Sequence, residues 1–377
     1  MISRRSLLIL FTALAVAVAP AASNLVDAQG KGTIKIASQS PLSGELAALG
    51  EGIKLGTQLA LEQLKGNIEK QGFKVELVPF DDQAKPEVGV ANAKNIIADK
   101  DVLAVIGHLN SGVAIPSSEV YKEAMLVMVS PANTNPTITD RGHPNVNRVC
   151  GRDDVQGIYA ANYMVDNKLA EKIAILHDKS AYGQGLADEF KKQLNARGVD
   201  ETMYEAITAG DKDFTALITK MKQAGVDLIY LGGYHTEAGL IARQASEQGI
   251  NATMMSGDAL VTDEYWAITG DTGQGTLMTF SPDPRKNEAA APVVAEFEAS
   301  GYDPEGYTLY TYATIQVWAQ AAEQAGSTEL DAVLEQLHGN QFETVLGTIS
   351  FDDKGDVEGE NYVMYEWDNG QYVQKGS

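Results

Sequence analysis

The sequence predicts an α/β protein of two lobes, each built on a doubly wound parallel sheet. Short apolar runs alternate with segments of helical periodicity from Thr33 to Val129, and the same alternation begins again at Asp153. Several of these runs stop abruptly in small, hydroxyl-bearing or aromatic residues. Parallel strands end in this way where their carboxyl ends border a crevice in an open sheet.

The first half of the chain follows a β-α-β-α-β-α-β order, which connects neighbouring parallel strands through helices. Glu45 to Leu64 carries apolar residues at helical spacing, and Pro86 suits the first turn of a helix. The predicted elements are a strand at 33–37, a helix at 45–64, a strand at 75–78, a helix at 85–97, a strand at 102–106, a helix at 113–123 and a strand at 126–129.

The second half repeats this pattern, and its strands end in loops that contain aromatic and acidic residues. It therefore predicts a second α/β lobe with its own crevice. The predicted elements are a helix at 153–165, a strand at 172–176, a helix at 185–196, a strand at 201–206, a helix at 214–224, a strand at 226–231, a helix that ends at 248 and a strand at 253–256.

The remainder of the chain begins with a proline-containing segment, Phe280 to Pro284, which we interpret as a crossing between the lobes. Three helical patterns follow at 288–299, 307–324 and 328–338, then a strand-turn-strand at 342–351, a charged connector at 352–360, a strand at 362–367 and a hairpin turn at Asn369-Gly370. If the helices pack on the first lobe, the chain crosses three times, as in a hinged receptor. We expect lobe 1 at 29–151 and 283–352, and lobe 2 at 152–282 and 353–377.

The first 28 residues have the composition of an export signal. Arg4 and Arg5 precede an apolar core at 7–19, and Val26-Asp27-Ala28 is a plausible cleavage triplet, with Ala22 as a rival site. The arginine pair also leaves a twin-arginine signal open. No later run is long and apolar enough to span a membrane, so we expect an exported, soluble, periplasmic protein.

Composition excludes some partners. The formal net charge of −22 becomes −23 when residues 1–28, with two arginines and one aspartate, are removed. Such a polyanion is repelled by nucleic acid and by anionic lipid, so we expect no nucleic-acid partner. The single cysteine, Cys150, allows no intramolecular disulfide, and no base stands beside it. We interpret it as a packed thiol and not as a nucleophile.

Two strand ends suggest a binding site for a carboxylate. The run 103–106 leads into Gly107-His108-Leu109-Asn110-Ser111, and the run 126–129 leads into Ser130-Pro131-Ala132-Asn133-Thr134. Ser111 is expected at or near the N-cap of the next helix, where hydroxyl and backbone N–H groups converge with the positive end of the helix dipole. Ser111, Ala132 and Thr134 are therefore candidates to hold the backbone end of a free amino acid, although both hydroxyls are also compatible with simple helix caps.

Four stretches together resemble the leucine/isoleucine/valine-binding proteins of bacterial branched-chain amino-acid ABC importers. They are Ile36-Ala-Ser-Gln-Ser-Pro-Leu-Ser-Gly44, Ala104-Val-Ile-Gly-His-Leu109, Ile207-Thr-Ala-Gly-Asp-Lys-Asp-Phe214 and Gly232-Gly-Tyr-His235. The resemblance covers essentially the whole chain after residue 28. It implies the type I periplasmic binding protein fold, with two lobes, a three-segment hinge and a ligand in the cleft.

The resemblance also implies roles for individual residues. Ser111 and Thr134 match the hydroxyls that bind the α-carboxylate, and the Ala132 carbonyl matches an acceptor for the ammonium. Tyr182 and Tyr234 match aromatics that close over the ligand. Asp258 stands where the family usually has a glutamate that pairs with the ammonium. Leu49 stands where close relatives have an aromatic residue, and Leu109 keeps an apolar contact.

The same resemblance implies the partners of the protein and implies that it needs no cofactor and is not an enzyme. It implies a monomeric receptor without a cofactor, which delivers a branched-chain or other aliphatic amino acid to the permease subunits of an ABC importer. Same-fold receptors for amides, short peptides or aromatic acids remain alternatives. A secreted hydrolase is a weaker one, since Gly-x-Ser-x-Gly is missing at Ser111. His108, His177 and His235 have no spacing suited to a metal, and the chain ends at Ser377 without the membrane segment of a sensory ectodomain.

Overall fold

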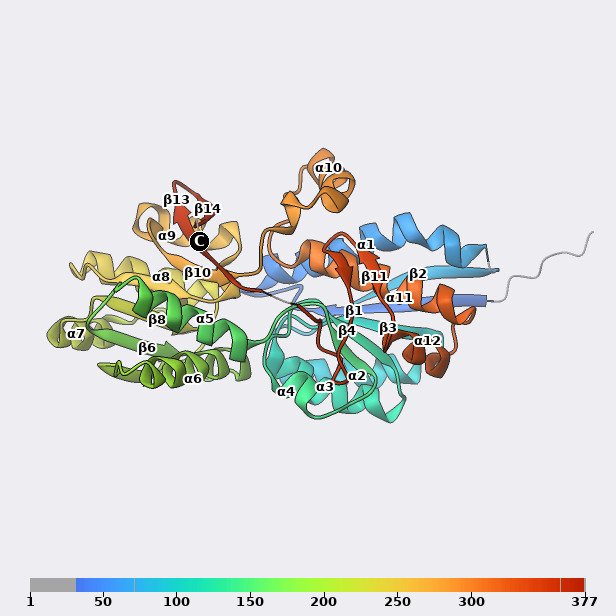
Figure 1. Cartoon of the computed structure of the whole chain (residues 1–377), viewed down its shortest axis with the longest axis horizontal. Coiled ribbons are helices and arrows are strands. Elements are labelled where there is room, and N and C mark those ends of the chain that lie inside the picture. Colours follow the sequence, from blue (N-terminus) through green and yellow to red (C-terminus); the bar gives the residue numbers. More distant parts are fainter. Residues whose placement is uncertain (1–31, 71, 360, 376–377) are drawn as a thin grey trace, which may run out of the picture.

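The computed structural model describes residues 32–70, 72–359 and 361–375, which form two α/β lobes placed end to end (Figure 1). The predicted export signal at 1–28 lies outside these residues. Among the described residues, no helix is long and apolar enough to cross a membrane. Lobe 1 is used below for the elements around the first sheet, and lobe 2 for those around the second.

The sheet of lobe 1 has five parallel strands in the order β2-β1-β3-β4-β5. Its strands are β1 (Gly32–Ser40), β2 (Phe73–Asp81), β3 (Val102–Gly107), β4 (Val127–Ser130) and β5 (Val146–Arg148). The order reverses direction beside β1, so the carboxyl ends of β1 and β3 border a crevice. The helices that connect these strands are α1 (Ala47–Glu69), α2 (Pro86–Ala98), α3 (Ser111–Glu123) and α4 (Thr137–Asp140).

The sheet of lobe 2 has seven strands in the order β14-β13-β10-β9-β8-β6-β7. The five from β10 to β7 are parallel, and β13 and β14 add antiparallel to the edge. The strands are β6 (Ile173–His177), β7 (Met203–Ala206), β8 (Leu228–Gly232), β9 (Thr253–Ser256), β10 (Leu277–Phe280), β13 (Val363–Asp368) and β14 (Gln371–Gln374), and the helices are α5 (Asp153–Asp166), α6 (Ala181–Ala196), α7 (Thr215–Ala224), α8 (His235–Glu247) and α9 (Asp263–Thr269).

The chain passes between the lobes three times, after β5, after β10 and after the β11–β12 hairpin. The segment between the last two crossings contains α11, which packs against α1 and the first sheet. Figure 1 shows α10 standing between the two lobes at their upper edge. The elements of this segment are α10 (Ala291–Ala299), α11 (Thr308–Ala325), α12 (Leu330–Leu337), β11 (Phe342–Thr344) and β12 (Gly347–Ile349). The exact limits of the lobes remain a prediction.

Both lobes contain large buried apolar side chains packed on their sheets. In lobe 1, Ile53 of α1 and Trp318 of α11 are buried in one cluster with β1 and β3 residues such as Ile36. In lobe 2, Phe190 of α6 stacks on Tyr230 of β8 with ring centroids 3.6 Å apart. Burial of large side chains contributes about 1.5–3 kcal/mol each, so each sheet is a rigid base for the loops at its strand ends.

The element types follow the sequence pattern, but several bounds differ. Helix α6 begins at Ala181 and not at 185, because the Ser180 hydroxyl caps it by accepting the Gly183 N–H at 2.9 Å. Residues 277–280 were not predicted as a strand, yet they form β10. Phe280 therefore ends a buried strand, and the crossing begins after it. Helix α9 and strand β14 were also missed, since both are short and partly polar.

Candidate functional site

A cavity lies between the lobes at the carboxyl ends of the parallel strands. Its volume is about 280 Å³, including the space at its opening. Six of the eight predicted ligand-binding residues line it. The complete lining is Leu49, Leu109, Ala132, Tyr182, Tyr234, Asp258, Ala259 and Tyr307. Both lobes contribute to it, so the cavity depends on their relative position.

The strand ends place most of these side chains. Leu109 follows β3, Ala132 follows β4, Tyr234 follows β8, and Asp258 and Ala259 follow β9. Leu49 comes from the first turn of α1. The geometry is that of a ligand crevice at the carboxyl edge of an open α/β sheet, and here two such edges face each other.

The remaining two predicted residues, Ser111 and Thr134, lie outside the cavity lining but are buried. Ser111 is the first residue of α3, and its hydroxyl accepts the Asn135 N–H at 3.4 Å. Thr134 is fully buried, and its carbonyl accepts the Asp153 N–H at 2.9 Å. The Asn110 side chain makes no cap to α3. The Asn110 side chain therefore does not occupy the N–H groups of the first turn of α3. Free N–H groups at this helix end are what the predicted anion site requires.

Asp258 is the acid at the cavity wall, and it is 4% exposed. Its two oxygens accept hydrogen bonds from the hydroxyls of Tyr182 at 2.9 Å and Tyr307 at 2.6 Å. Burial raises the pKa of Asp258, while hydrogen bonds from Tyr307, Gln156 and Tyr182 oppose that rise. The tyrosine hydroxyls thus keep a desolvated carboxylate in place beside the cavity.

A second buried acid, Asp153, stands near Asp258 and was not predicted as a site residue. It is fully buried as the first residue of α5. Burial and the charge of Asp258 raise the pKa of Asp153 well above its usual range, and the Thr134 hydroxyl and Arg148 oppose this. The main groups that stabilise the charge of Asp258 are two tyrosine hydroxyls and the Gln156 amide and not a cation, so this buried carboxylate at the cavity wall favours a positively charged group beside it.

Tyr182 and Tyr234 form an aromatic wall from lobe 2. Their ring centroids are 5.2 Å apart at an interplanar angle of 47°. The backbones that carry them approach closely, because a Cβ added to Gly183 would lie 2.4 Å from the Gly232 carbonyl oxygen. Only glycine allows this approach, which holds the two rings side by side.

Sequence reasoning missed Tyr307 as well as Asp153. Tyr307 lies at the N-cap of α11, on the segment that returns to lobe 1, and its hydroxyl reaches Asp258 of lobe 2. In the sequence it is one aromatic at the start of a helical pattern, which usually indicates a packing residue. Asp153 likewise reads as an ordinary acid in the first turn of a helix.

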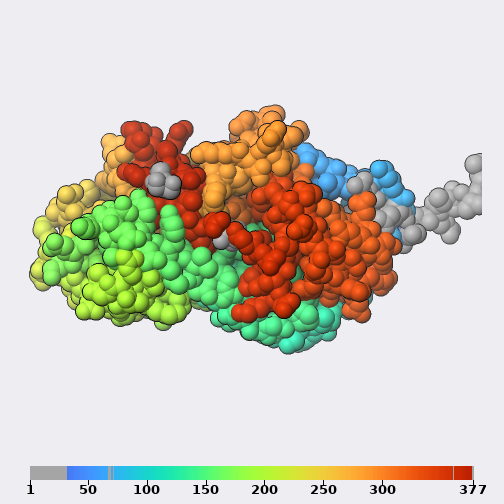
Figure 2. Space-filling view, viewed as in Figure 1, coloured from blue at the N-terminus to red at the C-terminus, as the bar shows by residue number. Residues whose placement is uncertain are grey.

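The lobes are in contact around the cavity, as the space-filling view also shows (Figure 2). The Asn135 side-chain amide donates to the Ala181 carbonyl at 2.7 Å, and Lys212 forms an ion pair with Glu45. On the hinge side, Glu305 accepts the Thr262 hydroxyl and the Asp263 N–H, both at 2.9 Å. The structure is therefore a closed form.

Metal binding or nucleophilic chemistry away from the cavity would depend on acidic, cysteine and histidine side chains. Within residues 32–70, 72–359 and 361–375, no group of three or more His, Cys, Asp or Glu side chains is arranged to hold a metal ion. Cys150 is 2% exposed and lies in the apolar core. His108 is fully buried, and it contacts Asp82 and Tyr121 at 3.4 and 3.3 Å, away from the cavity lining.

Comparisons with known proteins decide the family. A family model described as "Periplasmic binding protein" matches residues 33–371. "Leu/Ile/Val-binding protein homolog 2" of Brucella abortus is 47% identical over 348 residues, which cover 91% of this chain and 94% of the relative. This chain belongs to the Leu/Ile/Val-binding protein family. Another family relative, "Amino acid binding protein" of Pseudomonas aeruginosa, is 43% identical over 90% of this chain and 92% of its own.

Solved structures of this family have the same fold. The leucine-binding protein LivK from Thermotoga maritima superposes with a TM-score of 0.84 at 29% identity, over 91% of this chain and 98% of its own. LivJ from Streptococcus pneumoniae, in complex with isoleucine, gives a TM-score of 0.82 at 26% identity, over 91% of this chain and 100% of its own. The type I periplasmic binding protein fold predicted from the sequence is confirmed.

Proposed function

We propose that this chain is the periplasmic solute-binding component of an ABC importer. It binds a branched-chain or other aliphatic amino acid in the cavity between its lobes and presents the closed form to a membrane permease. It performs no catalysis. The observation that carries the proposal is the composition of the cavity, which joins a buried acid to an apolar wall.

A free amino acid at neutral pH needs three kinds of contact. Its ammonium requires a carboxylate or carbonyl acceptors, and Asp258 and the Ala132 carbonyl fill this role. Its carboxylate requires donors, for which the start of α3 at Ser111 and the Thr134 hydroxyl are the candidates. Its side chain requires an apolar surface, which Leu49 and Leu109 supply.

The same acid argues against the alternative of an aromatic acid. Benzoate carries a carboxylate but no ammonium, so binding it would bring a further negative charge beside Asp258 with no cation to pair with that acid. Like charges in a desolvated site disfavour each other strongly. A neutral amide or short peptide would leave the Asp258 carboxylate without a cation unless it brought an amino group.

Names of relatives support the substrate class. The Brucella abortus relative is named for leucine, isoleucine and valine, and the pneumococcal structure contains isoleucine. An apolar pocket separates side chains that differ by one methylene by only about 1–3 kcal/mol, so several aliphatic amino acids are expected to bind.

The test is calorimetric titration of protein that has been unfolded and refolded to remove bound ligand. Leucine, isoleucine, valine and alanine are titrated, with acetamide and benzoate as controls. Saturable one-to-one binding of at least one aliphatic amino acid, and none of benzoate, supports the proposal. Binding of benzoate or acetamide without any amino acid would overturn it.

A further inference from the structure

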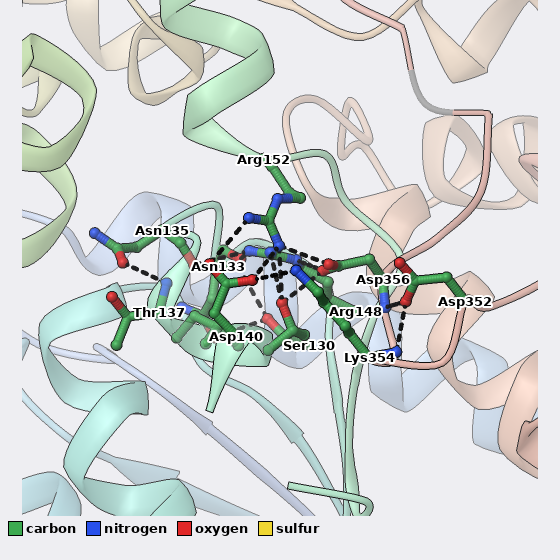
Figure 3. A network of polar contacts seen from close by, with 12 residues as sticks. Ser130, Asn133, Asn135, Thr137, Asp140, Arg148, Arg152, Asp352, Lys354 and Asp356 are labelled. Atoms are coloured by element: carbon green, nitrogen blue, oxygen red, sulfur yellow. Dashed lines mark hydrogen bonds and ion pairs between the residues drawn. The ribbon is translucent and has the colours of Figure 1, made fainter. Parts of the chain in front are cut away.

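A network of charges lies where the third crossing segment, the stretch between β12 and β13, meets both lobes (Figure 3). Its centre is Arg148, the last residue of β5, which is fully buried. The Arg148 Nε–H donates to Asp356 of the crossing segment. The backbone joins the same two segments, since the Arg148 N–H donates to the Gly355 carbonyl at 2.9 Å.

The Arg148 guanidinium also binds the loop that carries two predicted ligand contacts. Its Nη1 donates to the carbonyls of Asn133 and Asn135, each at 2.9 Å. These residues flank Thr134, and Ala132 directly precedes them. With the carbonyls on both sides of Thr134 fixed, Thr134 has little freedom to turn.

Asp356 extends the network to the start of lobe 2. Its Oδ2 accepts from Nη1 of Arg152 at 2.7 Å, and its Oδ1 accepts the Thr139 hydroxyl at 2.8 Å. Arg152 immediately precedes Asp153, the buried acid beside Asp258. One carboxylate on the crossing segment therefore joins the loop at 133–135 to the first turn of α5.

We propose that Arg148 is a positioning residue for the ligand. It holds the 133–135 loop in the orientation that presents Ala132 and Thr134 to the amino acid. Through Asp356, it makes that orientation depend on the third crossing segment, which connects the two lobes. The inference rests on the proposed function, because it concerns the ligand contacts of that same site.

The geometry explains why arginine is needed here. A planar guanidinium has five N–H donors in a fixed fork, and this one donates to a carboxylate, two carbonyls and the Thr139 hydroxyl at once. Lysine keeps the charge opposite Asp356 but has one nitrogen with three donors. It cannot hold the carbonyls of Asn133 and Asn135 while it also binds Asp356 and Thr139.

The experiment compares Arg148→Lys with Arg152→Lys by calorimetric titration with leucine. Arg152 shares Asp356 but has no bond to the 133–135 carbonyls, so it is the matched control. Arg148→Lys is expected to weaken leucine binding by about tenfold or more, as loss of supporting contacts does in other sites. Arg152→Lys is expected to change it by about threefold or less.

The readout separates positioning from folding. A variant that is irreversibly misfolded has fewer active molecules and hence a lower titration stoichiometry, whereas reversible unfolding raises the apparent Kd only if the unfolded fraction is large. Thermal unfolding of each ligand-free variant therefore first establishes that it is fully folded at the titration temperature. A positioning defect raises the Kd at full stoichiometry. Equal losses of affinity in the two variants, or an unchanged Kd in Arg148→Lys, would overturn the inference.

A second variant covers the case in which Arg148→Lys does not fold. Asp356→Asn keeps an acceptor oxygen and leaves the bonds from Arg148 to the Asn133 and Asn135 carbonyls possible, so the Kd should rise less than in Arg148→Lys but more than in Arg152→Lys. An unchanged Kd in this variant would show that ligand binding does not depend on the bond between Arg148 and Asp356, and would overturn that part of the inference. If the unmodified protein bound no amino acid, the proposed function itself would fail.

Discussion

Replacement of Asp258 by asparagine tests the ammonium site most directly. The side chain is 4% exposed, borders the cavity and is held by two tyrosine hydroxyls. In a closed cleft, an ammonium beside it would be desolvated. Truncation of one partner of a buried charge pair costs about 2–5 kcal/mol, so Asp258→Asn should weaken leucine binding by about 30-fold to several thousand-fold.

The fold should tolerate this change. Because burial raises the pKa of Asp258, its charge is held in the folded state at a cost, and asparagine removes that cost while it keeps the shape. Thermal unfolding of the ligand-free variant should therefore occur at or above the temperature of the unmodified protein, and calorimetric titration gives the loss of affinity.

Asp178→Asn is the matched control. Asp178 is also 4% exposed, and burial raises its pKa too, but it lies outside the cavity lining. Its replacement should change leucine affinity by about twofold or less. If Asp258→Asn kept its affinity, or if Asp178→Asn lost as much, Asp258 would not be the counter-ion of the ammonium.

Three further predictions concern other residues of the closed form. Tyr307→Phe removes one hydrogen bond that favours the charged Asp258, so leucine affinity should fall by about tenfold and its acid-side decline should move to higher pH; an unshifted pH profile would contradict this. Burial raises the pKa of Glu305 from 4.5 to about 7. The folded state therefore binds a proton more tightly than the unfolded state, and the unfolding free energy contributed by Glu305 falls, by at most about 3 kcal/mol, as pH rises from about 4.5 to about 7. Denaturant titrations across this range should show that fall in the unmodified protein and lose it in Glu305→Gln. Leu49→Phe fills part of the cavity, so titration should show leucine losing about tenfold relative to alanine, whereas an equal loss for both ligands would place Leu49 away from the ligand side chain.

The architecture was accessible from the sequence because its signals are local. Apolar runs such as Leu103 to Ile106 end in small residues, and the helices between them repeat at a regular period. Loops at the carboxyl ends of parallel strands must meet at one edge, so Leu109, Ala132 and Tyr234 could be assigned to the crevice before their positions were known. The roles of individual side chains came from the family resemblance and not from periodicity.

The parts that could not be predicted depend on the approach of distant segments. Tyr307 bonds to a residue 49 positions earlier, and this contact requires the start of α11 to lie beside the strand end after β9. Arg148 meets Asp356 across 208 positions. No local sequence pattern predicts either of these long-range contacts. Arginine is rarely fully buried, so the burial of Arg148 in a strand could not be expected from the sequence.

The arrangement of the acids explains why such a site can be both tight and broad in specificity. Asp258 and Asp153 lie in lobe 2, at the strand end after β9 and the start of α5, whereas Ala132 and Leu49 belong to lobe 1. In the proposed binding mode, elements of both lobes therefore bind the charged groups common to all amino acids, and closure buries these groups whatever the side chain is. In that mode, Leu49, Leu109 and their apolar neighbours contact the ligand side chain, and such contacts are worth about 1–3 kcal/mol per methylene. We therefore expect most of the binding free energy to come from the ammonium and carboxylate contacts and from closure. The preference among aliphatic ligands would then depend on the smaller apolar contribution, which single substitutions such as Leu49→Phe can change.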